Sequence, residues 1–492
     1  MHLTTCLLAS AGLWQAAHAV INLVPILPPD TGLDKRTTAN VKLHDKTSVY
    51  WADTPSNASI MVNVTLETGD DEMIVSMDYF APELQSVKCD GELALTFTSP
   101  DTYAKAIKDW SWVNFSQNRT FIMLVNYGNC SADSGRKPWL VNWANYDNRT
   151  NTVEFNATQK TWSDLQTGYT IQWGQNAGPT APDNSTAVAK RSIFGKLDPH
   201  WNPSMHIDVN HDFSKNLYTK NYKGVNFKID CANCGTKGRF NFAGHIKTTL
   251  RHPLTPSEMT MSVTPAGVEA DLGLSLNING KLASAWADEA TFLEIPIEAI
   301  HIPDLLQVGP ELTLSAGFSM QTIEGSATVS TGLTAKIPDS SIFFVDFLNS
   351  KNNKNNGWKP TLSTQPINVD AQINAGLDVY MKLAANLDCT VFNSYGMGVD
   401  LALQVPDIKV NVEADYSNKG NVCPNKKGDW GAKFSGAVGL DLKLQAWLQK
   451  GKDNKDYLYN GDLFSDPSLY TFPSVCFAFG SAPKTTVTQH NV

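Results

Sequence analysis

Apolar and polar residues alternate along much of this chain, which is the pattern of β-strands with one buried face and one face in water. The longest alternation runs through residues 367–383, where odd positions are apolar and even positions are mostly polar. One unbroken strand of that length would exceed about 50 Å, so we expect a bend and place it at Gly376. The pattern returns in residues 272–278, 312–320, 327–337 and 434–448.

Two turn signals predict hairpins between such stretches. Gly69-Asp70-Asp71 separates residues 60–66 from 73–80, and Ile323-Glu324-Gly325 separates residues 312–320 from 327–337. The acidic triplet Asp70-Asp71-Glu72 belongs to the first turn, where carboxylates serve the turn itself. We therefore give it no catalytic role.

Prolines mark interruptions of the strand pattern. In residues 399–416 the apolar phase shifts from odd to even positions across Pro406, which predicts a β-bulge. Three prolines fall within residues 295–310, and proline is excluded from helix interiors and from interior strands. We expect this segment to run as an extended apolar connection.

These patterns predict an all-β fold of two antiparallel, β-sandwich-like domains, the second larger and built from long amphipathic strands. Residues 99–110 alone read as a helix, with Ser99-Pro100 at its start. The predicted divisions are a signal peptide 1–19, a propeptide 20–36, a glycosylated domain 37–174, a linker 175–191, a second domain 192–480 and a polar tail 481–492.

Every N-glycosylation sequon lies before the dibasic pair Lys190-Arg191. The acceptors are Asn57, Asn63, Asn114, Asn118, Asn129, Asn148, Asn156 and Asn184. This asymmetry predicts one sugar-coated half and one bare half. Because an N-glycan is bulky, we expect the bare half to carry a contact face, along the polar sides of residues 367–383 and 434–448.

The first residues indicate secretion. A short apolar run is followed by Ala17-His18-Ala19, a small-x-small site that predicts cleavage after Ala19. Lys35-Arg36 and Lys190-Arg191 resemble kexin-type processing sites, which predicts cleavage after Arg36 and Arg191; the alternative is two surface charges at each place. With no transmembrane segment, we expect an extracellular protein.

Charge narrows the range of partners. The formal net charge is −9 and no run of Lys and Arg occurs, which argues against nucleic acid and anionic lipid. The sequence shows no nucleophile elbow, phosphate loop, dinucleotide fingerprint or calcium loop, so we predict no cofactor and assign no catalytic or metal-binding residue.

Cysteines should pair in an oxidising compartment. Once Cys6 leaves with the signal peptide, Cys89 and Cys130 are alone in the first half and pair by elimination. We expect Cys231 to pair with Cys234. One further bridge forms among Cys389, Cys423 and Cys476, and the sequence leaves open which of these stays free.

Two other groups of residues could form a metal-binding or catalytic site instead of having a purely structural role. Cys231 and Cys234, with His245 and His252, could be zinc ligands, but the spacing of the histidines does not fit a zinc finger. A redox-active pair would need the N-terminus of a helix beside it to stabilise the thiolate. We therefore favour a disulfide. His206, Asp208 and Asp212 share one face of a strand and could hold a metal or a general base. We favour a polar edge strand.

Seven tryptophans lie in the first half, at positions 51, 110, 112, 139, 143, 162 and 173. They form either a hydrophobic core or a platform for sugar rings. We favour the core.

The chain resembles a group of uncharacterised secreted fungal proteins built from two successive domains of unknown function. In the first half the resemblance rests on Cys89, Leu93-x-Leu95-x-Phe97, Trp110, Cys130, Arg136 and Trp162. In the second half it rests on Cys231-x-x-Cys234, Ile295-Pro296, Ile302-Pro303 and Val308-Gly309-Pro310. The resemblance implies a fungal extracellular context and no established activity.

We interpret the chain as a secreted fungal-type glycoprotein with a binding or structural role at the cell surface or in the extracellular space. Its partner would be a cell-wall glycan or another surface component. One alternative is a lipid-active β protein, either a lipid carrier or a pore former. A second is an extracellular hydrolase, because the acid pairs of glycosidases leave little local signature.

Overall fold

The computed structural model describes residues 20–26, 40–53, 61–174 and 205–479, apart from short gaps. The gaps are residues 128–129, 131–134, 283, 297–298, 321–322, 365–367, 374, 417–422, 425–426 and 452–454. Ala19, Arg36, Arg191, the linker 175–191 and the tail 481–492 lie outside the described residues.

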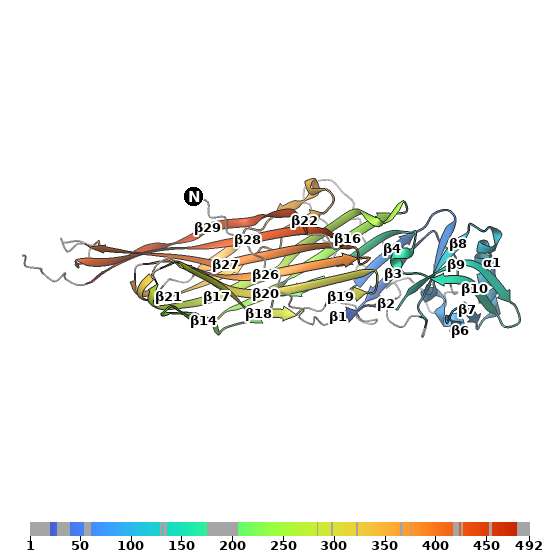
Figure 1. Cartoon of the computed structure of the whole chain (residues 1–492), viewed down its shortest axis with the longest axis horizontal. Helices are drawn as coiled ribbons and strands as arrows, with labels where there is room; N and C mark the ends of the chain where they lie inside the picture. Colours follow the sequence, from blue (N-terminus) through green and yellow to red (C-terminus); the bar gives the residue numbers. More distant parts are fainter. Residues whose placement is uncertain are drawn as a thin grey trace, which may run out of the picture.

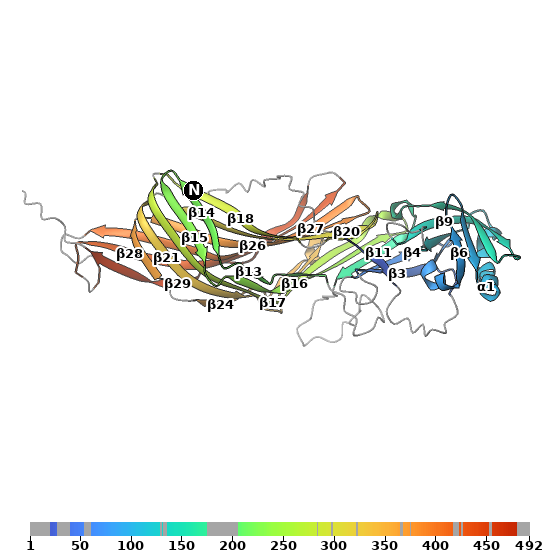
Figure 2. The same cartoon turned by 90° about the horizontal axis from the view of Figure 1, so that it is seen from below.

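The molecule is elongated (Figure 1). Strands β28 (Trp430–Lys450) and β29 (Asp456–Phe479) reach one end, and helix α1 (Pro100–Trp110) lies at the other, as Figure 2 also shows. Sheets that are mostly antiparallel build nearly all of it, which confirms the predicted all-β class.

A six-stranded sheet lies beside α1 in the first half. Its strands, in spatial order, are β5 (Glu72–Ser76), β8 (Thr120–Val125), β9 (Lys137–Asp147), β10 (Thr152–Gln159), β7 (Leu93–Phe97) and β6 (Leu84–Lys88). β8 is buried on both faces, which explains its continuous apolar sequence. The predicted helix begins where expected, because the Ser99 hydroxyl accepts a hydrogen bond from the Thr102 backbone N–H and Pro100 follows it.

A fifteen-stranded sheet runs through both halves. Its main path is β14 (Asn216–Tyr222), β15 (Val225–Cys231), β17 (His252–Leu282), β16 (Gly235–Thr249), β11 (Gly168–Gly174), β4 (Met61–Glu67), β3 (Lys46–Ala52) and β2 (Val24–Ile26). Branches are β12 (Met205–Asp208) and β13 (His211–Asp212) on β16; β21 (Ile323–Lys336) and β22 (Ile342–Asp346) on β17; β23 (Lys354–Asn356) on β22; and β24 (Thr361–Thr364) and β25 (Asn368–Ile373) on β21.

An eight-stranded sheet faces it. The order is β1 (Val20–Asn22), β19 (Ala299–Ile302), β20 (Leu306–Met320), β26 (Ala375–Val391), β27 (Tyr395–Tyr416), β28 and β29, with β18 (Trp286–Pro296) also paired to β20.

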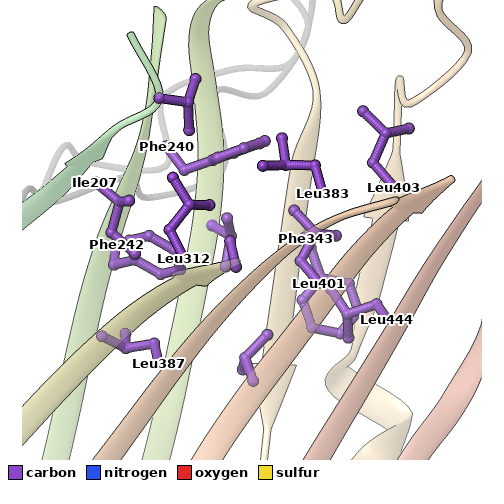
Figure 3. Close-up of a cluster of buried hydrophobic side chains, with 14 of the residues drawn as sticks. Ile207, Phe240, Phe242, Leu312, Phe343, Leu383, Leu387, Leu401, Leu403 and Leu444 are labelled. Atoms are coloured by element: carbon purple, nitrogen blue, oxygen red, sulfur yellow. The ribbon is translucent and has the colours of Figure 1, made fainter. Parts of the chain in front are cut away.

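One hydrophobic core fills the space between these two sheets. Figure 3 shows Ile207, Phe240 and Phe242 of the larger sheet close to leucines of β20, β26, β27 and β28. On β26, Val379, Met381 and Leu383 are buried in this core, as the alternation predicted. The polar residues between them point to the opposite side of the sheet.

Strand β11 joins the two halves of the chain. It pairs with β4 of the first half on one edge and with β16 of the second half on the other. The Tyr169 ring on β11 also contacts Phe392, in the turn between β26 and β27, with ring centroids 4.9 Å apart. The two halves therefore share backbone hydrogen bonds and a core.

The N-terminal segment is built into both large sheets. β1 pairs in parallel with β19, and β2 pairs with β3. Between them Leu23 is buried in the main core, and its backbone N–H donates to the His301 carbonyl at 3.1 Å. The alternation pattern predicts no strand in residues 20–26, although two are present. Two strands of three residues each are too short for alternation to reveal.

Both predicted hairpins are wrong. β4 pairs with β3 and β11, whereas β5 pairs in parallel with β8. β20 and β21 lie in opposite large sheets and do not pair. The turn residues indicate where the chain reverses direction. They do not identify the partner of each strand, which depends on which apolar face is buried in the core.

The two predicted strand irregularities, a bulge and a bend, agree with the structure better than the hairpins do. Pairing of β27 with β28 shifts between Gln404 and Asp407, which confirms a bulge at Pro406. We expected a bend at Gly376, and the chain changes sheet just before this residue. β25 ends at Ile373 in the larger sheet, and β26 begins at Ala375 in the eight-stranded one.

Most of the described residues between 295 and 310 belong to strands β18, β19 and β20 rather than to a mere connection, which corrects our expectation. Pro296 ends β18, and Pro303 follows the end of β19. Pro310 lies inside β20, opposite Leu387 of β26. On its other side β19 reaches only Val308 and β18 only Glu311, so the missing N–H of Pro310 falls where no neighbour pairs.

Leu23→Ala is expected to lower the free energy of unfolding by about 2–4 kcal/mol, because it empties a buried site. Val24→Ala is the matched control: this side chain is 37% exposed, and the expected loss is below about 1 kcal/mol. Chemical denaturation of the chain beginning at Val20 measures both. Equal, small losses would show that the segment does not anchor the fold.

Residues 192–492 expressed alone are expected to aggregate, because they lack β11 and leave the edge of β16 bare. Two domains with separate cores and separate sheets would instead stay soluble when divided. Co-expression of residues 20–190 should restore solubility, measured by gel filtration. A monodisperse, β-rich fragment without the first half would contradict the shared-sheet argument.

Candidate functional site

We define the outer face of the eight-stranded sheet as the face turned away from the core. Among the described residues, it carries Asp378, Asp388 and Asp400, whose pKa values are raised by burial. Here polar side chains stand on neighbouring strands in fixed register. Many of them are carboxylates that are partly or largely buried. Buried carboxylates are costly unless something compensates their charge.

Trp447 of β28 lies against this face rather than pointing away from it. Its ring covers Gly398 of β27, where an added Cβ would come within 2.4 Å of the indole carbons. The next outward glycine, Gly396, would place a Cβ 3.4 Å from the same ring. Glycine at both positions therefore lets the indole lie close to the backbone.

Three carboxylates lie in the same row as Trp447 or in the next outward row of the sheet. Asp388 of β26 pairs with Gly398, which in turn pairs with Trp447, so the three lie in one row across the sheet. Asn386 pairs with both Glu311 and Asp400, which places these two acids in the adjacent row. We call Glu311, Asp388, Asp400, Trp447 and Lys455 the Trp447 site.

Burial dominates the electrostatics of the Trp447 site. It raises the pKa of Asp388 to about 6, against the lowering effect of Lys455. Burial also raises the pKa of Asp400, while Lys455 and the Trp447 indole lower it. Nε1 of Trp447 is buried and faces Asp400 without a well-formed hydrogen bond. The Lys455 Nζ lies 3.6 Å from the centre of the Trp447 ring, a cation–π contact.

A second acidic group lies further along β26. Asp378 contacts Asp407 of β27, and Nζ of Lys409 lies 2.9 Å from the Asp407 carboxylate. Burial, then the hydrogen bond with Asp407, raises the pKa of Asp378 to about 8. Asp378 therefore holds a proton at neutral pH and can donate it to its neighbour.

A polar cluster adjoins this pair on the outer face. The Tyr380 hydroxyl donates to Glu289 of β18 at 2.8 Å, and the Nζ of Lys382 lies 3.5 Å from the same carboxylate. This Glu289 carboxylate has a cation partner, unlike those of Asp388 and Asp400, which make no ion pair among the described residues.

The residues singled out from the sequence are not gathered into one site. Cys231 and Cys234 form a disulfide, so their thiols are not available to zinc or to redox chemistry. His245 contacts Glu258 at 3.3 Å and Gln172 at 3.3 Å, and burial lowers its pKa. His252 begins β17.

His206 and Asp208 lie on β12 with Nε2 and Oδ2 3.5 Å apart. Asp212, on β13, instead accepts a hydrogen bond from the Ser214 backbone at 3.0 Å. No cluster of three or more His, Cys, Asp or Glu side chains in the described parts of the chain is arranged to hold a metal ion.

The remaining cysteines pair within each half. Cys89 bonds to Cys130, and Cys423 bonds to Cys476. Cys389 of β26 is the free cysteine among the described residues, and it is buried in the core. Burial raises the pKa of its thiol, which makes it unreactive.

The sequon asparagines differ in exposure. Asn118, Asn148 and Asn156 are exposed, and Asn114 is half-buried; Asn57, Asn129 and Asn184 lie outside the described residues. Asn63 is 5% exposed, and its amide nitrogen donates to Gln172 at 3.3 Å. Its folded position on β4 leaves no room for a glycan.

Five of the seven tryptophans of the first half are buried, as a core reading predicts. Trp112 is half-buried, and Trp143 is 51% exposed beside Asn156, its cross-strand partner. The Trp447 site, by contrast, was missed. A signal for it was Gly396-Met-Gly398, two glycines at alternate positions of a strand, which mark a close approach to the backbone.

A pocket of about 370 Å³ lies where the two halves join, lined by residues of β4, β11 and β16. Two of the charged groups on its walls have partners: Glu67 lies 3.1 Å from Lys46, and Lys247 lies 2.7 Å from Glu258. We assign it no chemistry.

Comparison with known families finds two successive matches. The description "Domain of unknown function (DUF7029)" applies to residues 67–170, and "Domain of unknown function (DUF7223)" applies to residues 207–464. Neither the curated proteins nor the solved structures contain a match to the chain. In the described regions, no helix has the length and apolar character needed to cross a membrane.

Asp378→Asn is expected to raise the melting temperature at alkaline pH and to leave it unchanged near pH 3.8. The folded protein keeps a proton on Asp378 up to about pH 8, whereas an ordinary carboxyl releases it near 3.8. This group therefore makes folding less favourable as pH rises between these values, and asparagine removes that loss. Thermal unfolding across the range measures the effect.

Asp462→Asn provides the control, because it removes the same charge from an exposed position on β29. A pH profile changed equally by both substitutions would show that net charge, and not the buried pair, is responsible.

Proposed function

We propose that this chain, which belongs to the family of the domain of unknown function DUF7223, is a secreted binding protein of the extracellular space and makes contact through the outer face of the eight-stranded sheet. The supporting observation is the Trp447 site. Trp447 is 3% exposed beneath Lys455, and the buried carboxylates Asp388 and Asp400 beside it make no ion pair among the described residues, an arrangement that stability alone would not favour.

Secretion is supported by several independent features. Three disulfides occur among the described residues, which fits an oxidising compartment. Strand β1 begins at Val20, directly after the expected signal cleavage site. The exposed sequon asparagines Asn118, Asn148 and Asn156 lie in the first half, away from the outer face.

The two rival functions have less support. A lipid carrier needs hollow space between its sheets, whereas the facing side chains of the described strands form one packed core. A glycosidase needs carboxyl groups about 5–9.5 Å apart across a groove. Asp378 and Asp407 are in direct contact, and Asp407 is 3% exposed.

The contact face needs one revision from the sequence-based hypothesis. Residues 368–373 belong to β25 in the larger sheet, so a glycan installed there through Asp370→Asn and Gln372→Thr would not cover the outer face. Residues of β26 and β28 remain on it.

Lys443→Asn combined with Gln445→Thr creates a sequon on the outer face of β28, where Lys443 is exposed. The glycosylated double variant, secreted from a eukaryotic host, is expected to lose association with washed cell-wall material. Co-sedimentation followed by immunoblotting measures the loss.

The control is Asn279→Thr, which turns Asn277 into a sequon acceptor on the outward side of β17 in the other sheet. A glycan there should leave association unchanged. If both glycosylated variants kept full association, the outer face would not be the contact surface.

A further inference from the structure

The Trp447 site contains more negative charge than the protein itself neutralises. Glu311, Asp388 and Asp400 contribute three carboxylates, and Lys455 is the cation that acts on the two buried ones. Glu311 raises the pKa of both of these aspartates further. Near neutral pH the site therefore favours an additional positive charge.

That positive charge is not a metal ion. Carboxylates on alternate rows of a sheet are too far apart to chelate one, and no chelating cluster occurs within the described residues. The aromatic ring instead favours an organic ammonium group, which is attracted by the ring face and by the surrounding acids together.

Lys455 already shows this mode of binding. Its ammonium lies over the ring at 3.6 Å, and the residue itself is exposed just before β29 begins. A long, flexible side chain at an exposed position can leave the ring without disturbing the sheet. The Trp447 site thus has an intramolecular occupant that an external amine can replace.

The face around the site is extended. On β26, Asp378 and Asp388 stand on the same side about 33 Å apart, at about 3.3 Å per residue. A ligand that repeats its cationic group suits such a row of acids. The Trp447 indole is 3% exposed while Lys455 lies over it, so the apolar C–H face of a sugar ring contacts the indole once Lys455 has moved away.

We propose that the Trp447 site binds the protonated amine of an amino-sugar polymer, and that Lys455 holds this position in the free protein. The proposal rests on the outer face being the contact surface. It adds the chemical class of the ligand and names the residues that select it: Trp447 for the ring, Asp388 and Asp400 for the amine.

Calorimetric titration of the full-length protein near neutral pH tests the proposal with three oligomers of equal length. These are a glucosamine oligomer, an N-acetylglucosamine oligomer and oligolysine. The first is expected to bind and the second is not, because acetylation removes the charge but keeps the sugar ring. Oligolysine binding as tightly as the glucosamine oligomer would overturn the assignment to amino sugars.

Lys455→Ala is expected to strengthen binding of the glucosamine oligomer several-fold, because it removes the internal competitor. Lys443→Ala removes the same charge from the outer face of the neighbouring strand and should change affinity less than about twofold. Equal strengthening by both would mean general attraction between charges, and the site would be discarded.

Two weakening variants complete the test. Trp447→Leu and, separately, Asp388→Gln with Asp400→Asn are expected to lower affinity about tenfold, and neither variant creates a sequon. The aspartate pair keeps the proposal testable if the tryptophan variant fails to fold. Binding by the unchanged protein should also weaken as pH falls through about 6, where Asp388 gains a proton.

The ligand class and the contact face can fail separately. If the β28 glycan abolished wall association while the glucosamine oligomer did not bind, the contact face would stand and the amino-sugar assignment would be wrong.

Discussion

Backbone hydrogen bonding on both edges of β11 is the constraint on which the rest of the molecule depends. The strand fixes β4 against β16, so the register of the first half is set by the second. A slip of one residue would turn every side chain of β4 to the other face and remove Val62, Val64 and Leu66 from the core. The same register brings Trp51, Trp162 and Trp173 into a core shared with the second half. The two halves differ in the number of sequons and in family assignment, yet they share one continuous sheet.

Arg136 shows how tightly this junction is specified. It is 1% exposed, and burial lowers its pKa while Asp78, with Oδ2 2.7 Å from Nε, opposes that shift. Its two terminal nitrogens donate to the carbonyls of Tyr50 at 2.6 Å and Ile26 at 3.1 Å, and its guanidinium lies over the Trp51 ring. A buried charge is tolerated only when such partners are all present. Because one partner is in β2, the N-terminal segment is part of what keeps this charge compensated.

The sequence predicted the strands well and their partners poorly. Alternation located the buried side of β26, and the phase shift at Pro406 located the bulge of β27, because both follow from local periodicity. Pairing is a long-range property, and β20 and β21 read as a hairpin although they face each other across the core. The Cys231–Cys234 bridge could be predicted from the local sequence alone. The Trp447 site could not, since it needs Gly398, Asp388 and Trp447 from three strands brought into one row.

The outer face is also where the molecule departs from what stability alone would favour. The same face carries Thr313 and Ser315 on β20, which avoid any charge penalty, so uncharged residues fit such positions. Asp378, Asp388 and Asp400 instead have raised pKa values caused first by burial, which means that their ionised forms make folding less favourable at neutral pH. A cation bound there would favour the ionised forms and return that stability, because a ligand that binds only the folded state stabilises it. The outer face thus buries carboxylates that lack a cation partner, and a cationic ligand would supply that partner. This is the physical reason to look for function there.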